Sequence, residues 1–180
     1  MSEELEFDLI LYPEPVLRRV AQPIGVDDEV QAIVAGMFAV MVRSKGVGLA
    51  GPQVGLKKRV LVINATGEPE DELALVNPTI VERSGPNVVF EEGCLSFPGI
   101  YAEVERREIC VVDALDPDGR PIRAEYTGFV SRIIQHEYDH LEGILLVDRM
   151  SPADKLRHKA ALEELVERYK RSRPAPARKR

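Results

Sequence analysis

The hydrophobic positions near the start of the chain recur at the spacing of an amphipathic helix. After the acidic run Asp27–Glu29, apolar residues follow three and four positions apart, which places them on one helix face. These positions are Val30, Ile33, Val34, Met37, Phe38 and Met41. Acidic residues favour the positive N-terminal end of a helix, and Gly46 is typical of the position just past its end. The pattern predicts a helix that begins near Asp27.

Two more helices are predicted in the second half of the chain. One runs from about Thr127, which can cap its first turn, to Glu142, and Gly143 can end it. The other begins at Ser151–Pro152, a cap followed by proline at the first helical position. Its apolar residues share one face, so we expect it to pack on the body of the protein. They are Leu162, Leu165, Val166 and Tyr169.

Short runs rich in β-formers dominate the sequence between the first two helices. The runs are Val60–Ile63, Leu73–Val76, Val88–Phe90, Ile109–Leu115 and Pro121–Tyr126. The segment Asp116–Gly119 predicts a hairpin turn between the last two. Because the strands cluster while the helices stand apart, we predict the α+β class. Mainly antiparallel β-sheets should pack around the central helix that starts near Thr127, with one helix before them and one at the C-terminus.

Composition narrows the class of protein. The 180 residues are 44% hydrophobic, which fits a globular domain, and no apolar run approaches the ~18 residues of a membrane span. The acidic N-terminus does not resemble an export signal, so we expect a cytoplasmic protein in which Cys94 and Cys110 stay reduced. No glycine-rich turn follows a strand and opens a helix, so no nucleotide cofactor is expected.

Charge is distributed unevenly along the chain. Residues 168–180 carry seven basic side chains and no acidic one, although the net charge is −6. The rest of the chain therefore has 17 basic against 30 acidic residues. An acidic body with a basic tail predicts an anionic partner for the tail. The alternative, a solvated terminus without a partner, stays open at this point.

The motif with the clearest chemistry lies in the central helix. His136 and His140 are four residues apart, so their side chains lie about 40° apart on one helix face and can bind one metal ion. Glu137 lies at the edge of that face, where it can reach a water on the metal. The alternative is a pair of surface histidines. The apolar residues elsewhere in this helix favour a buried element, and a buried histidine needs a partner.

A catalytic metal site usually has three protein ligands, and the third is harder to identify. Leu146 stands where one class of zinc proteases has a third histidine. Glu163 and Glu164 could serve as in another class, but they lie on the polar side of the C-terminal helix. Cys94 remains, because a thiolate binds zinc or ferrous iron strongly. A lone cysteine is more often a small buried hydrophobe, which is the interpretation we give Cys110.

Three segments in order along the chain resemble the motifs of the peptide deformylase family. They are Gly46–Gln53, Glu92–Ser96 and Gln135–His140. The resemblance extends over nearly the whole chain and includes Asp148–Arg149. Each motif alone is moderately specific, and the three together are highly specific. The resemblance implies a catalytic deformylase domain over residues 1–150, a helix packed on it over residues 151–173, and a flexible basic tail over residues 174–180.

The family resemblance implies a metal-dependent hydrolase that removes the N-terminal formyl group from formyl-methionyl nascent polypeptides and releases formate. Cys94, His136 and His140 would bind one divalent metal, with water in the fourth place. Glu137 would act as general base and then as general acid. The Gln53 side chain and the Leu95 backbone N–H would hold the oxyanion. Fe²⁺ is expected as the native metal, with Zn²⁺, Ni²⁺ or Co²⁺ possible in purified protein.

The same resemblance implies how substrate binds. The glycine loop with Gly48 and the segment with Gly93 would pair with the peptide as added strands. An apolar pocket for the methionine side chain would be lined by Val47, Phe90 and Ile133, although these residues could equally be plain core. Other positions have implied roles: peptide contact beyond methionine for Tyr101, and an ion pair between Glu92 and Arg106, although either could equally be a plain surface charge. The family usually has alanine where this chain has Gly51, and the flexibility of glycine is expected to loosen the loop there.

Two other functions remain as alternatives to a deformylase. An endopeptidase could use the same helix, but it needs a third ligand of the histidine or glutamate type. A ribosome-associated binding module without activity would lack a ligand or the base, yet all are present. For a deformylase, the basic tail and the C-terminal helix suggest the ribosome as a partner, close to where substrates emerge. No membrane partner is expected.

Overall fold

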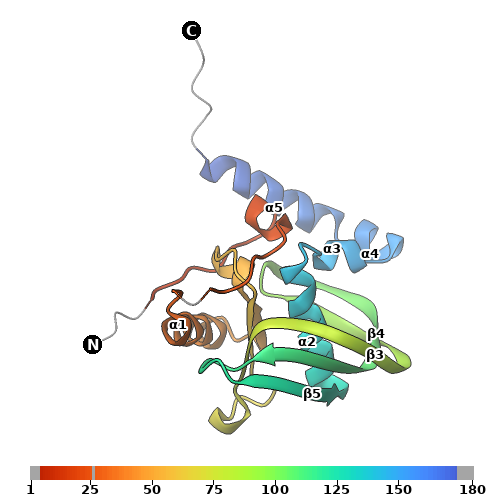
Figure 1. Ribbon diagram of the computed structural model, residues 1–180. Coiled ribbons are helices and arrows are strands. Elements are labelled where there is room, and N and C mark those ends of the chain that lie inside the picture. Colours follow the sequence, from red (N-terminus) through yellow and green to blue (C-terminus); the bar gives the residue numbers. More distant parts are fainter. Residues whose placement is uncertain (1–4, 26, 174–180) are drawn as a thin grey trace.

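The computed structural model describes residues 5–25 and 27–173, and its main element is one five-stranded antiparallel sheet (Figure 1). Each strand pairs with the next in the order of the chain. The strands are β1 (Gly48–Ala50), β2 (Val60–Ile63), β3 (Leu73–Cys94), β4 (Phe97–Leu115) and β5 (Pro121–Thr127). The predicted α+β class with antiparallel strands is therefore confirmed.

Strands β3 and β4 are much longer than the runs that predicted them. Their ladder contains four register shifts, at Val76/Thr79, Ile80/Glu82, Ser84/Asn87 and Gly93/Cys94. Each shift changes which side chains face the core, so the alternation of apolar and polar residues breaks there and the sequence reveals only fragments of each strand. The predicted turn at Asp116–Gly119 is present, because the Gly119 N–H donates to the Asp116 carbonyl (3.0 Å).

Helix α2 (Gly128–Leu141) lies in the middle of the molecule, as predicted (Figure 1). It packs against strands β1, β2, β4 and β5. Ile133, Ile134 and Leu141 belong to one buried cluster with residues of β2 and β4. Gly143 follows the end of the helix, and its φ of 71° suits glycine. A side chain there would also meet the Arg18 carbonyl at 2.5 Å, so the N-terminal segment can pass close to the helix end.

Helix α1 (Val30–Arg43) begins three residues later than predicted. The Asp28 carboxylate does not cap the helix; it accepts hydrogen bonds from the Gly25 N–H (2.6 Å) and the Lys58 amine (2.8 Å). These bonds lower the pKa of the Asp28 carboxyl, with the one from Lys58 as the largest cause. The buried face of α1 packs on β1 and β2.

The C-terminal part contains more helices than the sequence indicated. They are α3 (Leu146–Arg149), α4 (Pro152–Arg157) and α5 (Lys159–Ser172). The Ser151 hydroxyl accepts a hydrogen bond from the Asp154 N–H, which is the predicted cap. The single predicted helix is broken at His158, and α5 lies across one end of the molecule (Figure 1). Leu165 of α5 packs in one cluster with Ile100 of β4.

Short 3-10 helices complete the fold. They are η1 (Pro15–Arg18), η2 (Gly51–Val54) and η3 (Pro69–Asp71). Among the described residues, no helix combines the length and the apolar character that crossing a bilayer requires.

Candidate metal centre and substrate cavity

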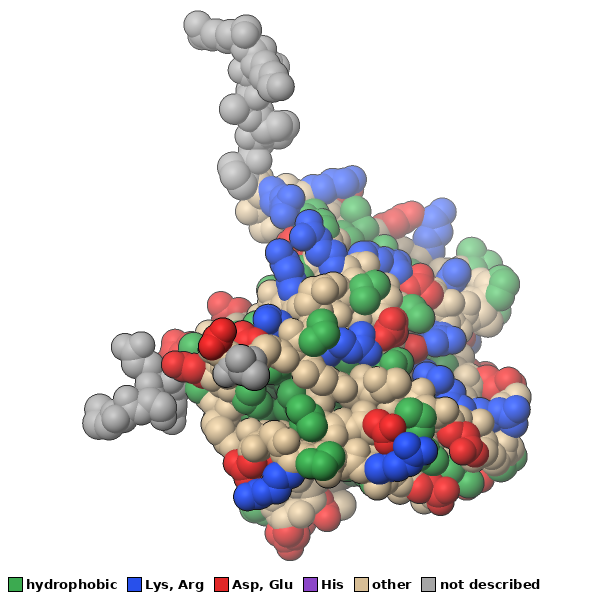
Figure 2. Space-filling view, in the orientation of Figure 1, with side chains coloured by type: hydrophobic (Ala, Val, Ile, Leu, Met, Phe, Trp, Pro, Cys, Tyr) green, Lys and Arg blue, Asp and Glu red, His purple; other side chains and the backbone are tan. Residues whose placement is uncertain are grey.

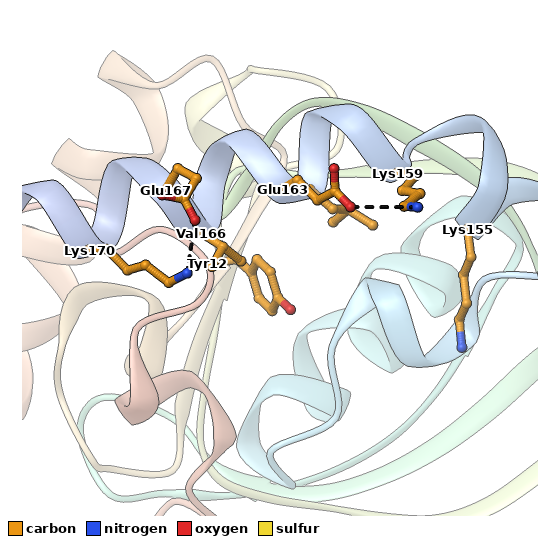
Figure 3. Close-up of a pocket in the computed structure, with 8 residues that line it drawn as sticks. Tyr12, Lys155, Lys159, Glu163, Val166, Glu167 and Lys170 are labelled. Atoms are coloured by element: carbon orange, nitrogen blue, oxygen red, sulfur yellow. Dashed lines mark hydrogen bonds and ion pairs between the residues drawn. The ribbon is translucent and has the colours of Figure 1, made fainter.

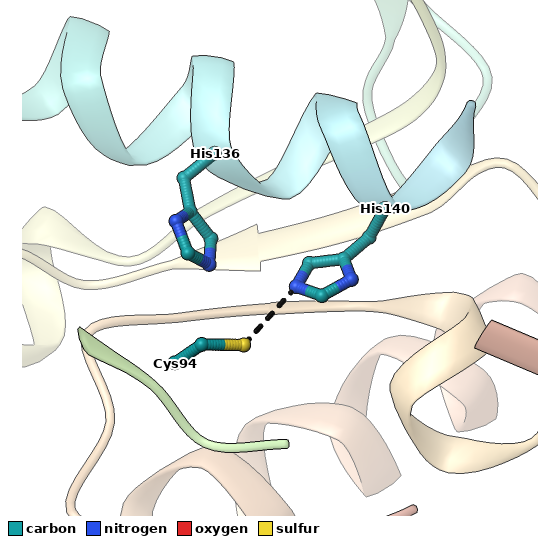
Figure 4. A group of neighbouring side chains, drawn as sticks. All are labelled: Cys94, His136 and His140. Carbon is teal, nitrogen blue, oxygen red and sulfur yellow. Dashed lines mark hydrogen bonds between the residues drawn. The ribbon is translucent and has the colours of Figure 1, made fainter. Parts of the chain in front are cut away.

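Three side chains that could bind a metal meet between α2 and the end of β3 (Figure 4). The ligand atoms of Cys94, His136 and His140 all lie within 4.8 Å of one another, and the Cys94 Sγ is 3.3 Å from the His140 Nε2. The histidines come from successive turns of α2. The cysteine reaches them because the ladder shifts register between Gly93 and Cys94. In the described ranges, this is the only such group of three.

The donor set fits a divalent cation. The His136 Nδ1 lies 2.9 Å from the Glu92 Oε2, so this ring N–H donates to the carboxylate and the Nε2 is left with its lone pair towards the cluster. Burial disfavours the protonated, charged form of both the His136 and the His140 ring. The Cys94 thiol and Glu92 nevertheless raise the pKa of His136 well above its usual value, whereas burial and positive neighbours lower that of His140. The raised pKa of His136 means that the group Cys94, His136 and His140 favours binding one proton. A metal ion can supply the same positive charge in place of that proton.

Glu92 is the centre of a buried ionic network behind His136. The predicted pair with Arg106 is present and bidentate, at 2.6 and 3.0 Å. The Arg132 guanidinium adds a third contact at 2.7 Å. Burial alone would raise the pKa of the Glu92 carboxyl, but the hydrogen bonds from His136 and Arg106 lower it to about 2. Glu92 therefore stays ionised and holds the ring of His136 in place.

The network continues from the same helix to the C-terminal part. The Asp139 carboxylate accepts from Arg106 at 2.9 Å and from Arg149 at 2.6 Å. Asp139 lies between the two histidines of the motif in the sequence, and its carboxylate contacts arginines and is not part of the Cys94–His136–His140 group. The buried carboxylates of Glu92 and Asp139 are therefore both paired with arginines, as burial of charge requires.

Glu137 differs from Glu92 because it has no such partners. Its side chain is buried, and its Oε2 makes no hydrogen bond to any described residue. Burial is the main cause that raises the pKa of this carboxyl to about 7, against the opposing charge of His136. Glycine at position 48 makes room for it, since a Cβ there would lie 2.7 Å from the Glu137 Oε1. A carboxyl with a pKa near neutrality can both accept and return a proton.

Gln53 is fixed by hydrogen bonds on both sides of its amide. Its Oε1 accepts from the Ala50 N–H (2.9 Å), while its Nε2 donates to the Ser96 Oγ (3.2 Å) and approaches the Cys94 Sγ (3.6 Å). The amide is buried in η2 and directed towards the metal cluster. Leu95 lines the cavity in front of this cluster. Ser96 was not predicted, although it lies in the same motif as Cys94.

Two neighbouring cavities open beside the cluster. The larger, of about 500 Å³, is lined by Gly46–Gly48, Gly93–Leu95, Tyr101, His136 and Glu137 among others. The smaller, of about 180 Å³, is mainly apolar. All five residues expected to bind substrate line one or both of these cavities: Val47, Gly48, Phe90, Gly93 and Ile133.

Two residues of the smaller cavity were missed by the sequence analysis. The Phe129 ring lies 6.3 Å from the Phe90 ring, and Arg132 lies over the Phe90 ring at 5.6 Å. A signal for them was available, because they precede His136 by seven and four residues and so share its helix face.

The residues considered as alternative third metal ligands lie on α5. Glu163 and Glu164 are exposed on α5 and pair with Lys159 and Arg168 of the same helix. They cannot supply the third ligand of an endopeptidase. Cys110 is buried without a disulfide, as expected of a small hydrophobe, and its thiol lies 4.0 Å from the Ser131 carbonyl oxygen. At Gly51 a Cβ would lie 2.4 Å from the Lys58 carbonyl, so glycine permits a close approach of the two segments; the looser loop stays a prediction.

The α+β fold and a Cys-His-His cluster beside a buried carboxyl are those of a metal-dependent hydrolase. The sequence model of the family described as polypeptide deformylase matches residues 7–156. The chain belongs to this family, whose members are metal-dependent enzymes that remove the N-formyl group from nascent peptides.

Individual relatives agree with this assignment. Peptide deformylase 1B, chloroplastic/mitochondrial, of Arabidopsis thaliana is 43% identical over 97% of this chain, which spans 66% of that protein's length. A peptide deformylase of Alkalilimnicola ehrlichii is 42% identical over 88% of this chain and 90% of its own length. The crystal structure of a plant peptide deformylase superposes with a TM-score of 0.90 at 41% identity and covers both chains fully. That of Plasmodium falciparum gives 0.89 at 40% identity, over 93% of this chain and 100% of that one.

Proposed function

We propose that this chain hydrolyses the formyl group of N-formyl-methionyl nascent peptides and releases formate. In this proposal Cys94, His136 and His140 bind one metal ion, and Glu137 transfers the proton. The observation that carries the proposal is the convergence of a thiol and two imidazoles within 4.8 Å, beside a buried carboxyl with one oxygen that makes no hydrogen bond to the described residues. Membership of the deformylase family supports the reaction.

The chemistry can be divided between the metal and the side chains. When bound, the metal polarises the formyl carbonyl and makes a water more acidic. Glu137 accepts the proton of that water and then delivers it to the departing amine nitrogen, so that no amide anion has to leave. The Gln53 amide and the Leu95 N–H stabilise the negative charge on the formyl oxygen. One such donor is worth about 3–4 kcal/mol in comparable sites.

We propose Fe²⁺ as the native metal, with Zn²⁺, Ni²⁺ or Co²⁺ able to replace it. A thiolate with two imidazoles suits all four ions, so the choice rests on the family resemblance. Metal analysis of protein purified without oxygen tests this assignment. Iron at about one equivalent per chain is expected, and stoichiometric zinc without iron from cells grown with both metals would contradict it.

For substrate binding, we propose that the smaller cavity holds the methionine side chain between Val47, Phe90 and Ile133. Its volume of about 180 Å³ and its apolar lining support a side chain of this size. Gly48 and Gly93 line the adjoining cavity, where their backbone would pair with the peptide as an added strand.

We propose further that residues 151–173 form a C-terminal helical extension that, with the basic tail, associates with the ribosome. Figure 2 shows basic side chains over α5, and Figure 3 shows lysines along a groove beside it. This groove has a volume of about 540 Å³ and is lined by Tyr12, Lys155, Lys159, Leu162, Glu163, Val166, Glu167 and Lys170. Lys159 and Lys170 pair with Glu163 and Glu167, so the tail should supply most of the unpaired charge. Residues 174–180 lie outside the described residues.

Deletion of residues 168–180 tests this partner. The shortened protein should bind ribosomes more weakly, most clearly at low salt, because fewer cations contact phosphates. Its cleavage of a short formyl-Met peptide should stay unchanged. Equal ribosome affinity of both proteins at low salt would contradict the proposal.

We also propose a cytoplasmic location, supported by the two free cysteines. Cell fractionation with antibody detection tests it, and recovery in an organelle or membrane fraction would contradict it.

The proposed reaction is tested by formate release from a formyl-Met tripeptide with protein purified without oxygen. The wild type should release formate, and Glu137→Ala should lose about 10²–10⁴-fold in kcat, because the variant lacks the carboxyl proposed to transfer the proton. Failure of the metal-loaded wild type to release formate would reject the proposed function. So would full activity of the Glu137→Ala variant.

A further inference from the structure

One edge of the sheet near the substrate cavity is contacted by a histidine from the C-terminal helices. Strand β5 pairs with β4 only from Ile109 to Leu115, so residues 97–108 of β4 have a strand neighbour on one side alone. At this edge the His158 Nε2 lies 2.6 Å from the Tyr101 carbonyl oxygen, where the ring N–H can donate to it. Exposed strand edges present unpaired backbone groups, and this contact satisfies one of them.

The break in the C-terminal helix places the histidine there. His158 is both the C-cap residue of α4 and the N-cap residue of α5, with φ −97° and ψ 8°. Both helices are anchored nearby, since Asp154 of α4 is buried and Leu165 of α5 packs in the cluster that contains Ile100 and Ala102. The imidazole is therefore held against the strand by the packing on both sides of it.

Tyr101 connects this edge to the substrate cavity. Its side chain lines the larger cavity together with Cys94, His136 and Glu137. The ring lies across Gly93, its partner in the ladder, where an added Cβ would come within 2.7 Å of it. Tyr101 is 53% exposed and belongs to none of the buried clusters, so its ring is positioned by the contact with Gly93 and by the backbone that carries it.

We propose that His158 is a positioning residue for the part of the substrate beyond methionine. It holds the Tyr101 carbonyl, and thereby keeps the Tyr101 ring over Gly93, in the path of a peptide that extends from the metal cluster. This inference rests on the proposed deformylase function. It assigns to the α4–α5 junction a role in substrate affinity, since His158 touches neither the cluster nor the cavity.

The test compares two substrates, formyl-Met-Ala-Ser and formyl-methionine amide, which ends before the second residue. For His158→Ala, the KM of the tripeptide should rise about fivefold with kcat unchanged, as expected for the loss of one hydrogen bond. The KM of the amide should change by less than about twofold. His158→Gln, which keeps an N–H donor of similar reach, should restore the tripeptide KM. Glu163→Ala, an exposed change on α5, is the matched control and should behave like the wild type.

A double-mutant cycle with Tyr101→Ala completes the design. In that background, His158→Ala should add almost nothing to the tripeptide KM, because the backbone carbonyl remains but the ring that it positions is gone. The inference would be overturned if the KM of both substrates changed equally or if kcat changed. It would also be overturned if His158→Gln did not restore the tripeptide KM, or if the effects of His158→Ala and Tyr101→Ala were additive. In those cases the wild type still releases formate, so the proposed function survives. A wild type that cleaves neither substrate would reject both.

Discussion

At the scale of single residues, two buried carboxyls on either side of His136 have opposite environments. Glu92 accepts hydrogen bonds from two arginines and a histidine, and these outweigh burial, so its pKa falls to about 2. Glu137 has one oxygen without a partner, and burial raises its pKa to about 7. One carboxyl is thus a permanent charge and the other can exchange a proton at neutral pH, a division of roles typical of hydrolase sites.

The first prediction concerns Glu92→Gln. The amide removes the negative charge that holds the His136 ring, so affinity for the metal should fall about 10–100-fold. Competition with a chelator measures this affinity. Glu91→Gln is the matched control, because the neighbouring side chain is exposed and pairs with no described cation. Chelator competition that does not distinguish Glu92→Gln from the wild type would contradict this role.

At the scale of elements, helix α2 and strand β1 approach each other closely enough to enclose the site. Gly48 permits this, because a Cβ there would lie 2.6 Å from the Ile133 Cγ2 and 2.7 Å from Glu137. The approach depends on one residue without a side chain, in a strand of only three residues.

The second prediction is that Gly48→Ala moves β1 from α2 or displaces the carboxyl of Glu137. Activity should fall at least about tenfold, since a shift of about 1 Å in a catalytic group can cost 10²-fold. Formate release and far-UV circular dichroism together measure activity and fold. Gly25→Ala is the control, as its Cβ would make only an ordinary contact at 3.6 Å. A fully active Gly48→Ala enzyme would show that the close approach does not matter.

Much of the site could be predicted because its chemistry lies in short motifs. His136, Glu137 and His140 follow from helical spacing, and Cys94 with Gln53 from the family resemblance. Arg132 and Ser96 were missed, because their importance comes from contacts with Glu92 and Gln53 on other elements. The break at His158 was also missed, since no glycine or proline after Pro152 marks it in the sequence.

At the scale of the whole molecule, side chains far apart in the sequence connect the N-terminal segment to the C-terminal helices. The Arg18 guanidinium pairs with the Asp148 carboxylate, which also accepts from the Leu145 N–H (2.8 Å). Burial would raise the pKa of Asp148, but the bonds from Arg18 and Leu145 lower it below its usual value. This contact links η1 to α3 across 130 positions of the chain.

The third prediction is a pH-dependent effect of Asp148→Asn. A carboxyl with a lowered folded-state pKa stabilises the fold above its unfolded pKa, and this contribution is lost as pH falls through the folded pKa. Both side chains are more than a third exposed, so screening limits the loss at pH 7 to about 1 kcal/mol in the free energy of unfolding. Urea unfolding should show this loss at pH 7 and a smaller one near pH 3. An equal loss at both pH values would contradict the ionic explanation.

Metal content of Cys94→Ala, measured beside the wild type after anaerobic purification, tests the central claim most directly. A thiolate and two imidazoles should hold about one equivalent in the wild type, and the variant should retain little of it, because two imidazoles alone bind far more weakly. Full occupancy in Cys94→Ala would mean that another residue completes the site, and the proposed metal centre would be wrong.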